Sequence, residues 1–99
     1  MISFGELNPL LHSQLRLAIM SLLIGVRTAD FSYLKEKTEA SAGNISVQIG
    51  KLEEAGYLKS NKSFKNKRPN TSYTITQLGV REFEKYVDVL QQYLEVAKK

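Results

Sequence analysis

The 99-residue sequence contains no cysteine, one histidine and only two prolines. Without cysteine, the chain can form no disulfide, no thiolate metal site and no cysteine nucleophile. The single histidine, His12, has no evident partner for acid–base catalysis, and the sequence holds no Gly-rich phosphate loop and no nucleophile motif. These absences argue against an enzyme, and we expect no cofactor and no metal site.

The chain also lacks a long hydrophobic run. Its most apolar stretch, LAIMSLLIGV at 17–26, is about half the roughly 20 residues that a membrane span needs. The residues before this stretch lack the basic start of a signal peptide, and no cleavage site follows it. The length suits one modest core, and 42% hydrophobic with 24% charged residues is typical of a folded protein. We therefore expect a single domain over residues 1–99, with no membrane segment.

Negative charge is missing from one part of the chain. The formal net charge is +4, and residues 1–40 and 77–99 each hold equal numbers of basic and acidic side chains. Residues 57–76 hold five basic side chains and no acidic one, namely Lys59, Lys62, Lys65, Lys67 and Arg68. A surface with such unopposed charge is expected to meet a polyanion. A solvated lysine-rich loop is the alternative interpretation.

A helix is predicted close to the N-terminus. Asn8 can cap its free N–H groups and Pro9 suits its first turn, so we expect a helix from about Pro9 to Ile24, with Gly25 as its stop. Its apolar side chains are too many for one stripe. This pattern indicates a central helix, or one shared with a partner subunit. A very short strand is predicted to follow, over residues 29–31.

Two further helices are predicted in close succession. Ser32 is expected to cap the first, over residues 33–40, with Leu34 as its main core contact. Ser41 is expected to cap the second, which ends at Gly56. Three apolar side chains, at spacings of four and three, form the buried face of the second helix: Ile45, Ile49 and Leu52. Two helices joined by so brief a connection predict a helix-turn-helix.

A β-hairpin is predicted over residues 57–76. Strand-forming residues flank the sequence KNKRP at 65–69, which contains no hydrophobic side chain. We expect Pro69 in this loop, where its missing N–H group is not needed.

A long last helix is predicted over residues 77–97, with Thr76 as its cap. Apolar side chains recur at heptad spacing along it: Val80, Phe83, Val87, Leu90 and Leu94, followed by Ala97. This seam is short for an independent coiled coil but favours helix pairing. We therefore expect a homodimer with 77–97 as its dimerisation helix. The alternative is a monomer in which this helix packs on the first helix of its own chain.

In this order, the elements resemble the winged helix-turn-helix domains of bacterial and archaeal transcription regulators, especially those of the MarR-like (multiple-antibiotic-resistance regulator) type. The similarity spans nearly the whole chain, and its most specific part is KLEEAGYL followed by the basic hairpin and TSYTIT. The resemblance implies an α+β, mostly α fold: helix, short strand, helix, helix, two-stranded wing and long C-terminal helix. It implies a cytoplasmic, nucleoid-associated regulator of transcription. Its partner would be double-stranded DNA, with a recognition helix at about 42–55 in the major groove and a wing at 57–76 on the minor groove or backbone.

Candidate DNA-binding residues follow from this resemblance and from the exposed side of the third helix. Gln48 is the best candidate for base reading, because its amide can pair bidentately with adenine. Ser46 and Lys51 are better suited to phosphate contacts, and Arg68 to insertion into a narrow minor groove. Relatives commonly carry a basic residue and a histidine at Val47 and Gln48, so the departure indicates weaker specific affinity or a more AT-rich site. The full candidate set is Ser41, Gly43, Asn44, Ser46, Val47, Gln48, Lys51, Lys62, Lys65, Lys67, Arg68 and Asn70.

A protein-interaction module without specific DNA binding remains the alternative function, because fold alone does not fix function. The unopposed charge of the hairpin favours nucleic acid over this alternative. The sequence identifies no operator and no effector. Any small-molecule pocket is expected between the first and the last helix.

Overall fold

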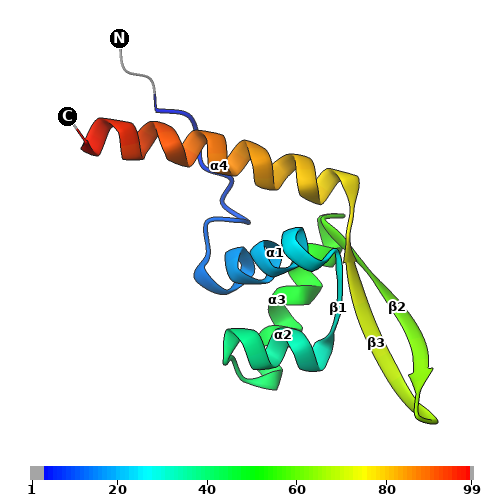
Figure 1. Cartoon of the computed structure of the whole chain (residues 1–99). Helices are drawn as coiled ribbons and strands as arrows, with labels where there is room; N and C mark the ends of the chain where they lie inside the picture. The colour runs from blue at the N-terminus through cyan, green and yellow to red at the C-terminus, as the bar shows by residue number, and fades with distance from the viewer. Residues whose placement is uncertain (1–3, 99) are drawn as a thin grey trace.

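A computed structural model describes residues 4–98, which form four helices and one small three-stranded sheet. The elements are α1 (Gln14–Val26), β1 (Thr28–Asp30), α2 (Phe31–Thr38), α3 (Ala42–Glu54), β2 (Leu58–Lys65), β3 (Arg68–Ile75) and α4 (Gln77–Ala97). Figure 1 shows α1, α2 and α3 gathered into one body, from which the β2–β3 hairpin and α4 extend in different directions. The predicted order of elements is confirmed, as is the mostly helical α+β class.

The core lies where α1, α2 and α3 meet the base of the sheet. Eight large side chains in it are fully buried: Leu11, Ile19, Met20, Leu23, Leu34, Ile45, Leu52 and Leu58. The predicted role of Leu34 is therefore confirmed, as is the apolar face of α3, where Ile49 is also buried. Burial of this face leaves the opposite side of α3 in solvent.

The first helix begins later than predicted. Asn8 does accept the N–H of Leu10 with its side chain, at 2.9 Å, but it closes only one isolated turn. The backbone then extends at Ser13, with φ −151° and ψ 129°, and α1 starts at Gln14. The predicted helical start at Pro9 is therefore wrong, because an Asn followed by a Pro is as typical of an isolated turn as of a helix start.

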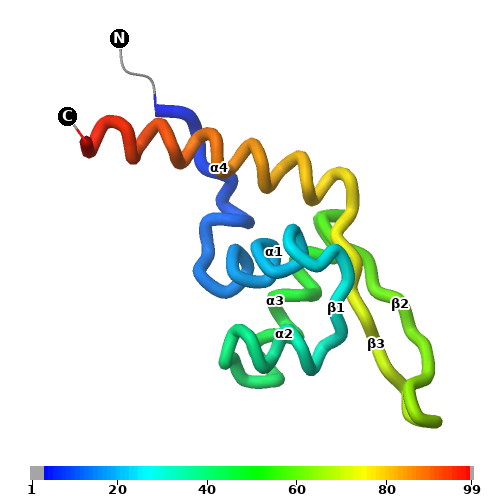
Figure 2. The backbone as a smooth tube through the Cα atoms, in the orientation of Figure 1, coloured from blue at the N-terminus to red at the C-terminus, as the bar shows by residue number. Residues whose placement is uncertain are grey.

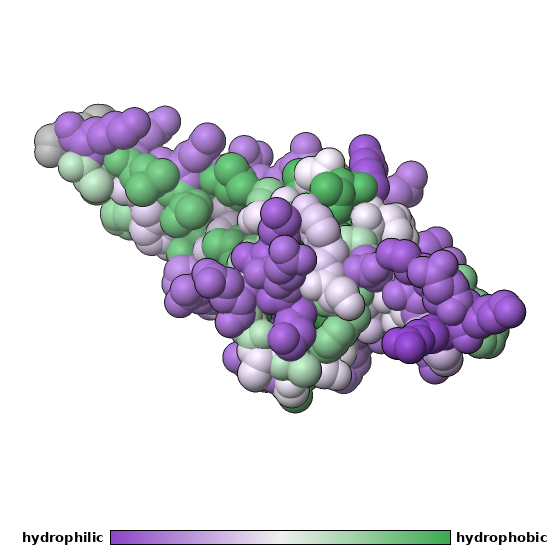
Figure 3. Space-filling model, turned by 60° about the horizontal axis from the view of Figure 1, so that its bottom comes forward, coloured by the Kyte–Doolittle hydropathy of each residue, from purple (hydrophilic) through white to green (hydrophobic). Residues whose placement is uncertain are grey.

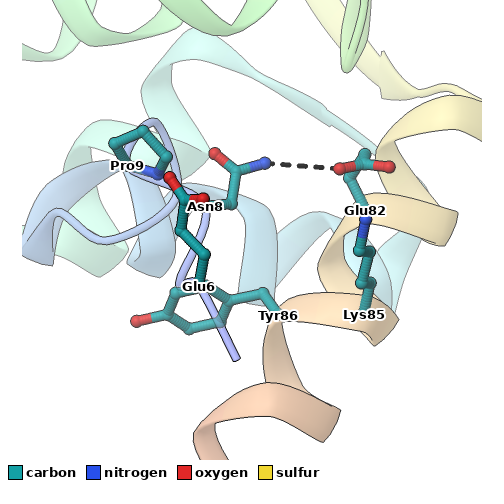
Figure 4. A pocket seen from close by; sticks show the side chains of 6 residues that line it. All are labelled: Glu6, Asn8, Pro9, Glu82, Lys85 and Tyr86. Carbon is teal, nitrogen blue, oxygen red and sulfur yellow. Dashed lines mark hydrogen bonds between the residues drawn. The ribbon is translucent and has the colours of Figure 1, made fainter. Parts of the chain in front are cut away.

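Asn8 also ties its turn to the rest of the molecule. Its amide nitrogen donates to the hydroxyl of Tyr57, at 2.8 Å, and to the carboxylate of Glu82 on α4, at 3.4 Å. Figure 4 shows the second of these bonds at the edge of a pocket of about 300 Å³, between the N-terminal segment and α4. Further along, the hydroxyl of Tyr93 donates to the carbonyl of Gly5, at 2.7 Å. The N-terminal segment therefore runs beside α4, as Figure 2 shows.

The first helix also ends later than predicted. Gly25 remains helical, and Arg27, with φ 71°, ends α1 by donating its N–H to the carbonyl of Leu23. The carbonyl of Arg27 accepts the N–H of Ile75, at 3.1 Å, so this residue already belongs to the edge of the sheet. Pairing with β3 therefore fixes where the helix stops, and Gly25 is not its stop.

Each helix of the helix-turn-helix begins at a capping side chain, and the sequence predicted one of the two caps. Asp30 caps α2 by accepting the N–H of Tyr33, at 2.8 Å, so the predicted cap at Ser32 is wrong by two residues. Ser41 caps α3 by accepting the N–H of Asn44, at 3.2 Å, which confirms that prediction. The strand before α2 covers 28–30, one residue earlier than predicted.

The sheet has the strand order β1-β3-β2, and both pairs are antiparallel. A two-residue turn, Asn66 and Lys67, joins β2 to β3, and both residues have positive φ, 54° and 64°. This geometry matches the twist of a tight hairpin. The loop predicted at 65–69 is therefore shorter, and the hairpin is extended almost to its tip.

Pro69 lies inside β3, opposite Phe64, and not in the loop where it was predicted. Pairs alternate along an antiparallel ladder, and the hairpin closes at Lys65 and Arg68, so position 69 directs its backbone nitrogen away from β2. On that side β1 has already ended, because Asp30 pairs with Ser72. The missing N–H of the proline therefore costs no strand pairing.

The start of the long helix α4 is hydrogen-bonded to the segment that follows α3. Thr76 caps it by accepting the N–H of Gly79, at 3.0 Å, as predicted, and its hydroxyl donates to the carbonyl of Gly56, at 2.6 Å. The N–H of Thr76 donates to the carbonyl of Tyr57, at 3.0 Å. A Cβ at Gly79 would overlap that same carbonyl, so only glycine allows this approach. The start of α4 is thereby fixed to the end of α3 and to β2.

Candidate nucleic-acid interface

The exposed side of α3 carries most of the candidate residues predicted for DNA. Six of them are exposed: Ser41, Gly43, Asn44, Ser46, Val47 and Lys51. Residues 42–50 include no charged side chain, so the first turns of α3 carry no negative charge that would repel phosphates. Val47 is 55% exposed although it is apolar. This surface can approach a duplex closely and contact thymine methyl groups.

Two glycines lie on the exposed side of α3. Gly43 and Gly50 have negative φ, and apart from the adjacent backbone of α3 no atom of residues 4–98 lies within 4 Å of the position that a Cβ would occupy at either residue. Neither glycine is therefore required by the fold of the free protein. A mid-helix glycine costs about 1 kcal/mol relative to alanine, so the fold alone gives no reason for Gly50.

Gln48 differs from its neighbours because it is half-buried. Arg16, at the start of α1, donates from its guanidinium group to the amide oxygen of Gln48 and to the carbonyl of Leu10. The amide nitrogen of Gln48 donates to the side chain of Asn44, at 3.1 Å. The side chain predicted to read bases is therefore held in one orientation by groups on two helices.

The wing is the hairpin of β2 and β3, and its basic side chains reach solvent. Lys62, Lys65, Lys67 and Arg68 are exposed, and Asn70 is half-buried. Among the described residues, Lys65 makes the one salt bridge, with Asp30 at 3.9 Å, and it is still 68% exposed. Such a pair contributes little. Figure 3 shows hydrophilic side chains gathered over the wing, while the neighbouring underside of the helical body is paler and partly apolar.

The base of the wing contacts the end of α3. Glu53 accepts two hydrogen bonds from Ser60, at 3.1 Å from its N–H and 2.6 Å from its hydroxyl. Burial raises the pKa of the Tyr73 hydroxyl, and the nearby charge of Glu53 raises it further. These contacts fix the wing relative to α3, so both surfaces can meet one ligand together.

Sequence reasoning missed two residues of this region. Arg16 contacts Gln48 across 32 positions of sequence, and no local pattern announces a contact at that distance. Phe64 is 79% exposed near the tip of the wing. In the sequence it counts only as a strand-forming residue. The signal that could have identified Phe64 was a large apolar side chain within a basic hairpin.

Other functional sites find little support in the described part of the chain. Residues 4–98 contain no group of three or more His, Cys, Asp or Glu side chains that could hold a metal ion. Over the same range, none of the helices has the length and apolar character needed to cross a membrane. A hollow of about 410 Å³ does lie where an effector pocket was expected, between Ile24 on α1 and Val80, Phe83 and Val87 on α4. Three charged residues, Arg27, Glu84 and Asp88, complete its lining, and the set indicates no ligand class.

Comparison with known proteins gives consistent matches. Residues 15–94 match the family model described as a winged helix DNA-binding domain. An uncharacterised protein of Methanocaldococcus jannaschii is 37% identical over 81 residues, covering 81% of this chain and 88% of that protein. The structure of a transcriptional regulator homologue from Pyrococcus horikoshii matches with a TM-score of 0.85 and 29% identity, covering 91% of this chain and 89% of that one. A MarR mutant from E. coli, solved in complex with operator DNA, matches with a TM-score of 0.74 and 16% identity, covering 88% of this chain and 61% of that one.

Proposed function

Because the chain belongs to the family of winged helix DNA-binding domains, which bind DNA and are not enzymes, we propose that it is a sequence-specific transcriptional regulator that acts on double-stranded DNA in the cytoplasm. The observation that carries this proposal is the pairing of two surfaces. The helix α3, whose residues 42–50 carry no charged side chain, contacts at its end a wing that holds five basic residues and no acidic one within 57–76. The first surface suits a groove and the second suits phosphates.

In the proposed complex, α3 occupies the major groove. Gln48 reads adenine, Val47 contacts thymine methyl groups, and Gly50 lets the helix backbone approach the bases. Ser46 and Lys51 contact phosphates on either side and set the register of the helix. Because Val47 suits thymine methyl groups and Gln48 suits adenine, we expect an AT-rich site with modest specificity.

The wing supplies affinity in this proposal. Lys67 lies in the turn and Arg68 is the first residue of β3, so these two are the foremost cations of the hairpin. Lys62, Lys65 and Asn70 lie behind them and can follow the backbone of the duplex. Each phosphate contact releases counterions, so binding is expected to weaken steeply as salt rises.

We further propose a homodimer through α4. Of the predicted seam, Val80, Phe83 and Leu90 pack against the core of their own chain, which is the arrangement expected of a monomer. Leu94 is 52% exposed, and Val87 lines the apolar hollow beside α1. Figure 3 shows apolar side chains following α4 toward its far end. This outer part of the seam is available to a second copy, and two-fold symmetry would then present two α3 helices to a pseudo-palindrome.

Selection of bound sequences from a random duplex pool tests the proposed function. We expect enrichment of an AT-rich site with two related halves, and loss of the preference at one base position per half when Gln48 is changed to alanine. Binding without enrichment of any sequence would reduce the function to non-specific DNA binding. A chain that retains no duplex at low salt would overturn the proposal and favour the protein-interaction module.

A further inference from the structure

The most exposed large apolar side chain of the described chain belongs to the wing. Phe64 is 79% exposed, whereas the other exposed apolar side chains range from 38% to 55%. Single exposed apolar residues are common on protein surfaces. Phe64 is unusual because of its surroundings: Lys62, Lys65 and Arg68 lie within two positions of it along its strand or across from it.

Phe64 has one apolar neighbour on the wing. It pairs with Pro69 at a position where the two backbones exchange no hydrogen bonds, so the two side chains lie close together on one face. The adjacent pair, Lys65 and Arg68, points to the opposite face and closes the two-residue turn. The last two pairs of the hairpin therefore place an apolar pair on one face and a basic pair on the other.

Within residues 4–98, no other helix or strand covers this apolar pair. The strand β1 ends opposite Ser72, so the last four pairs of the hairpin project beyond the body of the molecule. Figure 1 shows this part of the hairpin standing clear of α2 and α3. Packing within the chain therefore does not account for Phe64.

A second copy of the wing is also a poor partner for Phe64. The free edge of the sheet is β2, whose lysines 59, 62 and 65 repel another basic strand and disfavour edge-to-edge pairing. The hairpin offers no acidic side chain to offset that repulsion. A polyanion with apolar surface between its charges matches both features, and the bases of a duplex provide such a surface.

We propose that Phe64, backed by Pro69, is an apolar wedge that enters the minor groove and partly unstacks one base step. This inference rests on the DNA binding proposed above and adds deformation of the duplex to it. Apolar side chains inserted between base steps kink DNA toward the major groove, and pyrimidine–purine steps unstack most readily. Arg68, on the other face, neutralises phosphates along the groove. The wing thus contributes shape selectivity in addition to charge.

A fluorescent duplex tests the wedge. The probe is a short AT-rich duplex with 2-aminopurine in place of adenine at its TpA steps and a donor–acceptor dye pair at its ends. At saturating protein, we expect the wild-type chain to raise the 2-aminopurine fluorescence and shorten the dye separation. F64A should bind about tenfold more weakly, as loss of one buried aromatic contact implies, and should change neither signal at saturation. F64L should retain most of both signals.

Control variants distinguish failure of the wedge from failure of the proposed DNA binding. K67A should weaken binding but leave the fluorescence at saturation unchanged, because it removes charge and not the wedge. If F64A raises the fluorescence as the wild type does, the wedge is overturned while DNA binding stands. If the wild-type chain does not bind the duplex at low salt, both proposals are overturned. Phe64 is exposed, so F64A should keep the wild-type circular dichroism.

Discussion

The guanidinium group of Arg16 on α1 donates a hydrogen bond to the side-chain oxygen of Gln48 on α3. The amide nitrogen of Gln48 donates in turn to Asn44, one turn earlier on the same helix. An amide oxygen has two lone pairs and an amide nitrogen two hydrogens, so Gln48 still has one acceptor site and one donor site free. Those two groups are what bidentate pairing with adenine requires. Arg16 therefore orients Gln48 without occupying the two groups that the proposed base reading needs.

Changing Arg16 to alanine should reduce sequence preference more than general affinity. Without its partner the Gln48 amide can rotate, so we expect about a tenfold smaller ratio of specific to random-duplex binding, as the loss of one hydrogen bond to a charged group implies. Competition binding measures the ratio. R27A, at the other end of α1, removes the same charge and should leave the ratio unchanged. Equal loss of specific and random binding in R16A would contradict the positioning role.

The K67A/R68A double variant should change the salt dependence of binding. Removing two phosphate contacts should reduce the slope of log K against log salt by about 1.8, at roughly 0.9 for each contact. Titrations at several salt concentrations measure this slope. The matched control is K85A/K98A, which removes one exposed lysine of α4 and the exposed lysine that follows the helix, and it should preserve the slope if the wing is the contact surface.

Replacing Gly50 with alanine should separate stability from DNA binding. Beyond the adjacent backbone of its own helix, the added methyl group meets no atom of the described residues within 4 Å, so the free energy of unfolding should rise by about 1 kcal/mol. The same methyl group lies on the face proposed to meet DNA, so affinity should fall. Urea denaturation and duplex titration measure the two effects. G25A, also helical and equally open, should stabilise the protein without weakening binding; a G50A variant that binds like wild type would place α3 outside the interface.

Leu94 should matter for the oligomeric state. L94E adds a charge to the exposed part of the α4 seam, so we expect at least a tenfold weaker dimer in light scattering or sedimentation. Q91E adds the same charge to an exposed position of α4 outside the seam and should leave the dimer intact. A wild-type chain that is monomeric at micromolar concentration would contradict the proposed dimer under those conditions.

Tyr73 should make the fold sensitive to alkaline pH. Burial, and secondarily the charge of Glu53, raises the pKa of its hydroxyl above the ordinary value of 10.0. A group whose pKa is higher in the folded state stabilises the fold at low pH, and this contribution is lost as the pH rises through the folded value. Stability should therefore fall above pH 10, and less so in Y73F. Denaturation at a series of pH values measures this difference, and parallel curves for the two proteins would contradict it.

Much of the fold could be predicted because its signals are local. The caps at Ser41 and Thr76 each accept an N–H three residues later in the chain, and the buried face of α3 follows from one helical period. The failures involve partners distant in sequence. Gly25 looked like a helix stop, but Arg27 ends α1 because its carbonyl pairs with Ile75. Pro69 looked like a loop residue, but its place in β3 depends on where β1 ends.

The candidate interface shows the same division. The basic charge of the wing could be counted from the sequence, and the charged side chains of the hairpin are exposed as that count predicted. The orientation of Gln48 could not be anticipated, because it depends on Arg16, and α1 lies beside α3 only in the folded chain. Charge patterns therefore identified the surface, but the positioning of its side chains required the tertiary structure.

The hydrogen bonds of Thr76 give α4 the mechanics of a lever. These bonds join the start of the helix to the carbonyls of Gly56 and Tyr57. The 21 residues of α4, about 31 Å long, extend from that point. A tilt of about 10° there would carry the far end by about 5 Å. In a two-fold dimer held together at the far ends, the angle at this point would therefore set the distance between the two α3 helices. The angle of α4 at Thr76 would then determine the spacing of the bound half-sites. A ligand that moves α4 away from α1 would change that spacing.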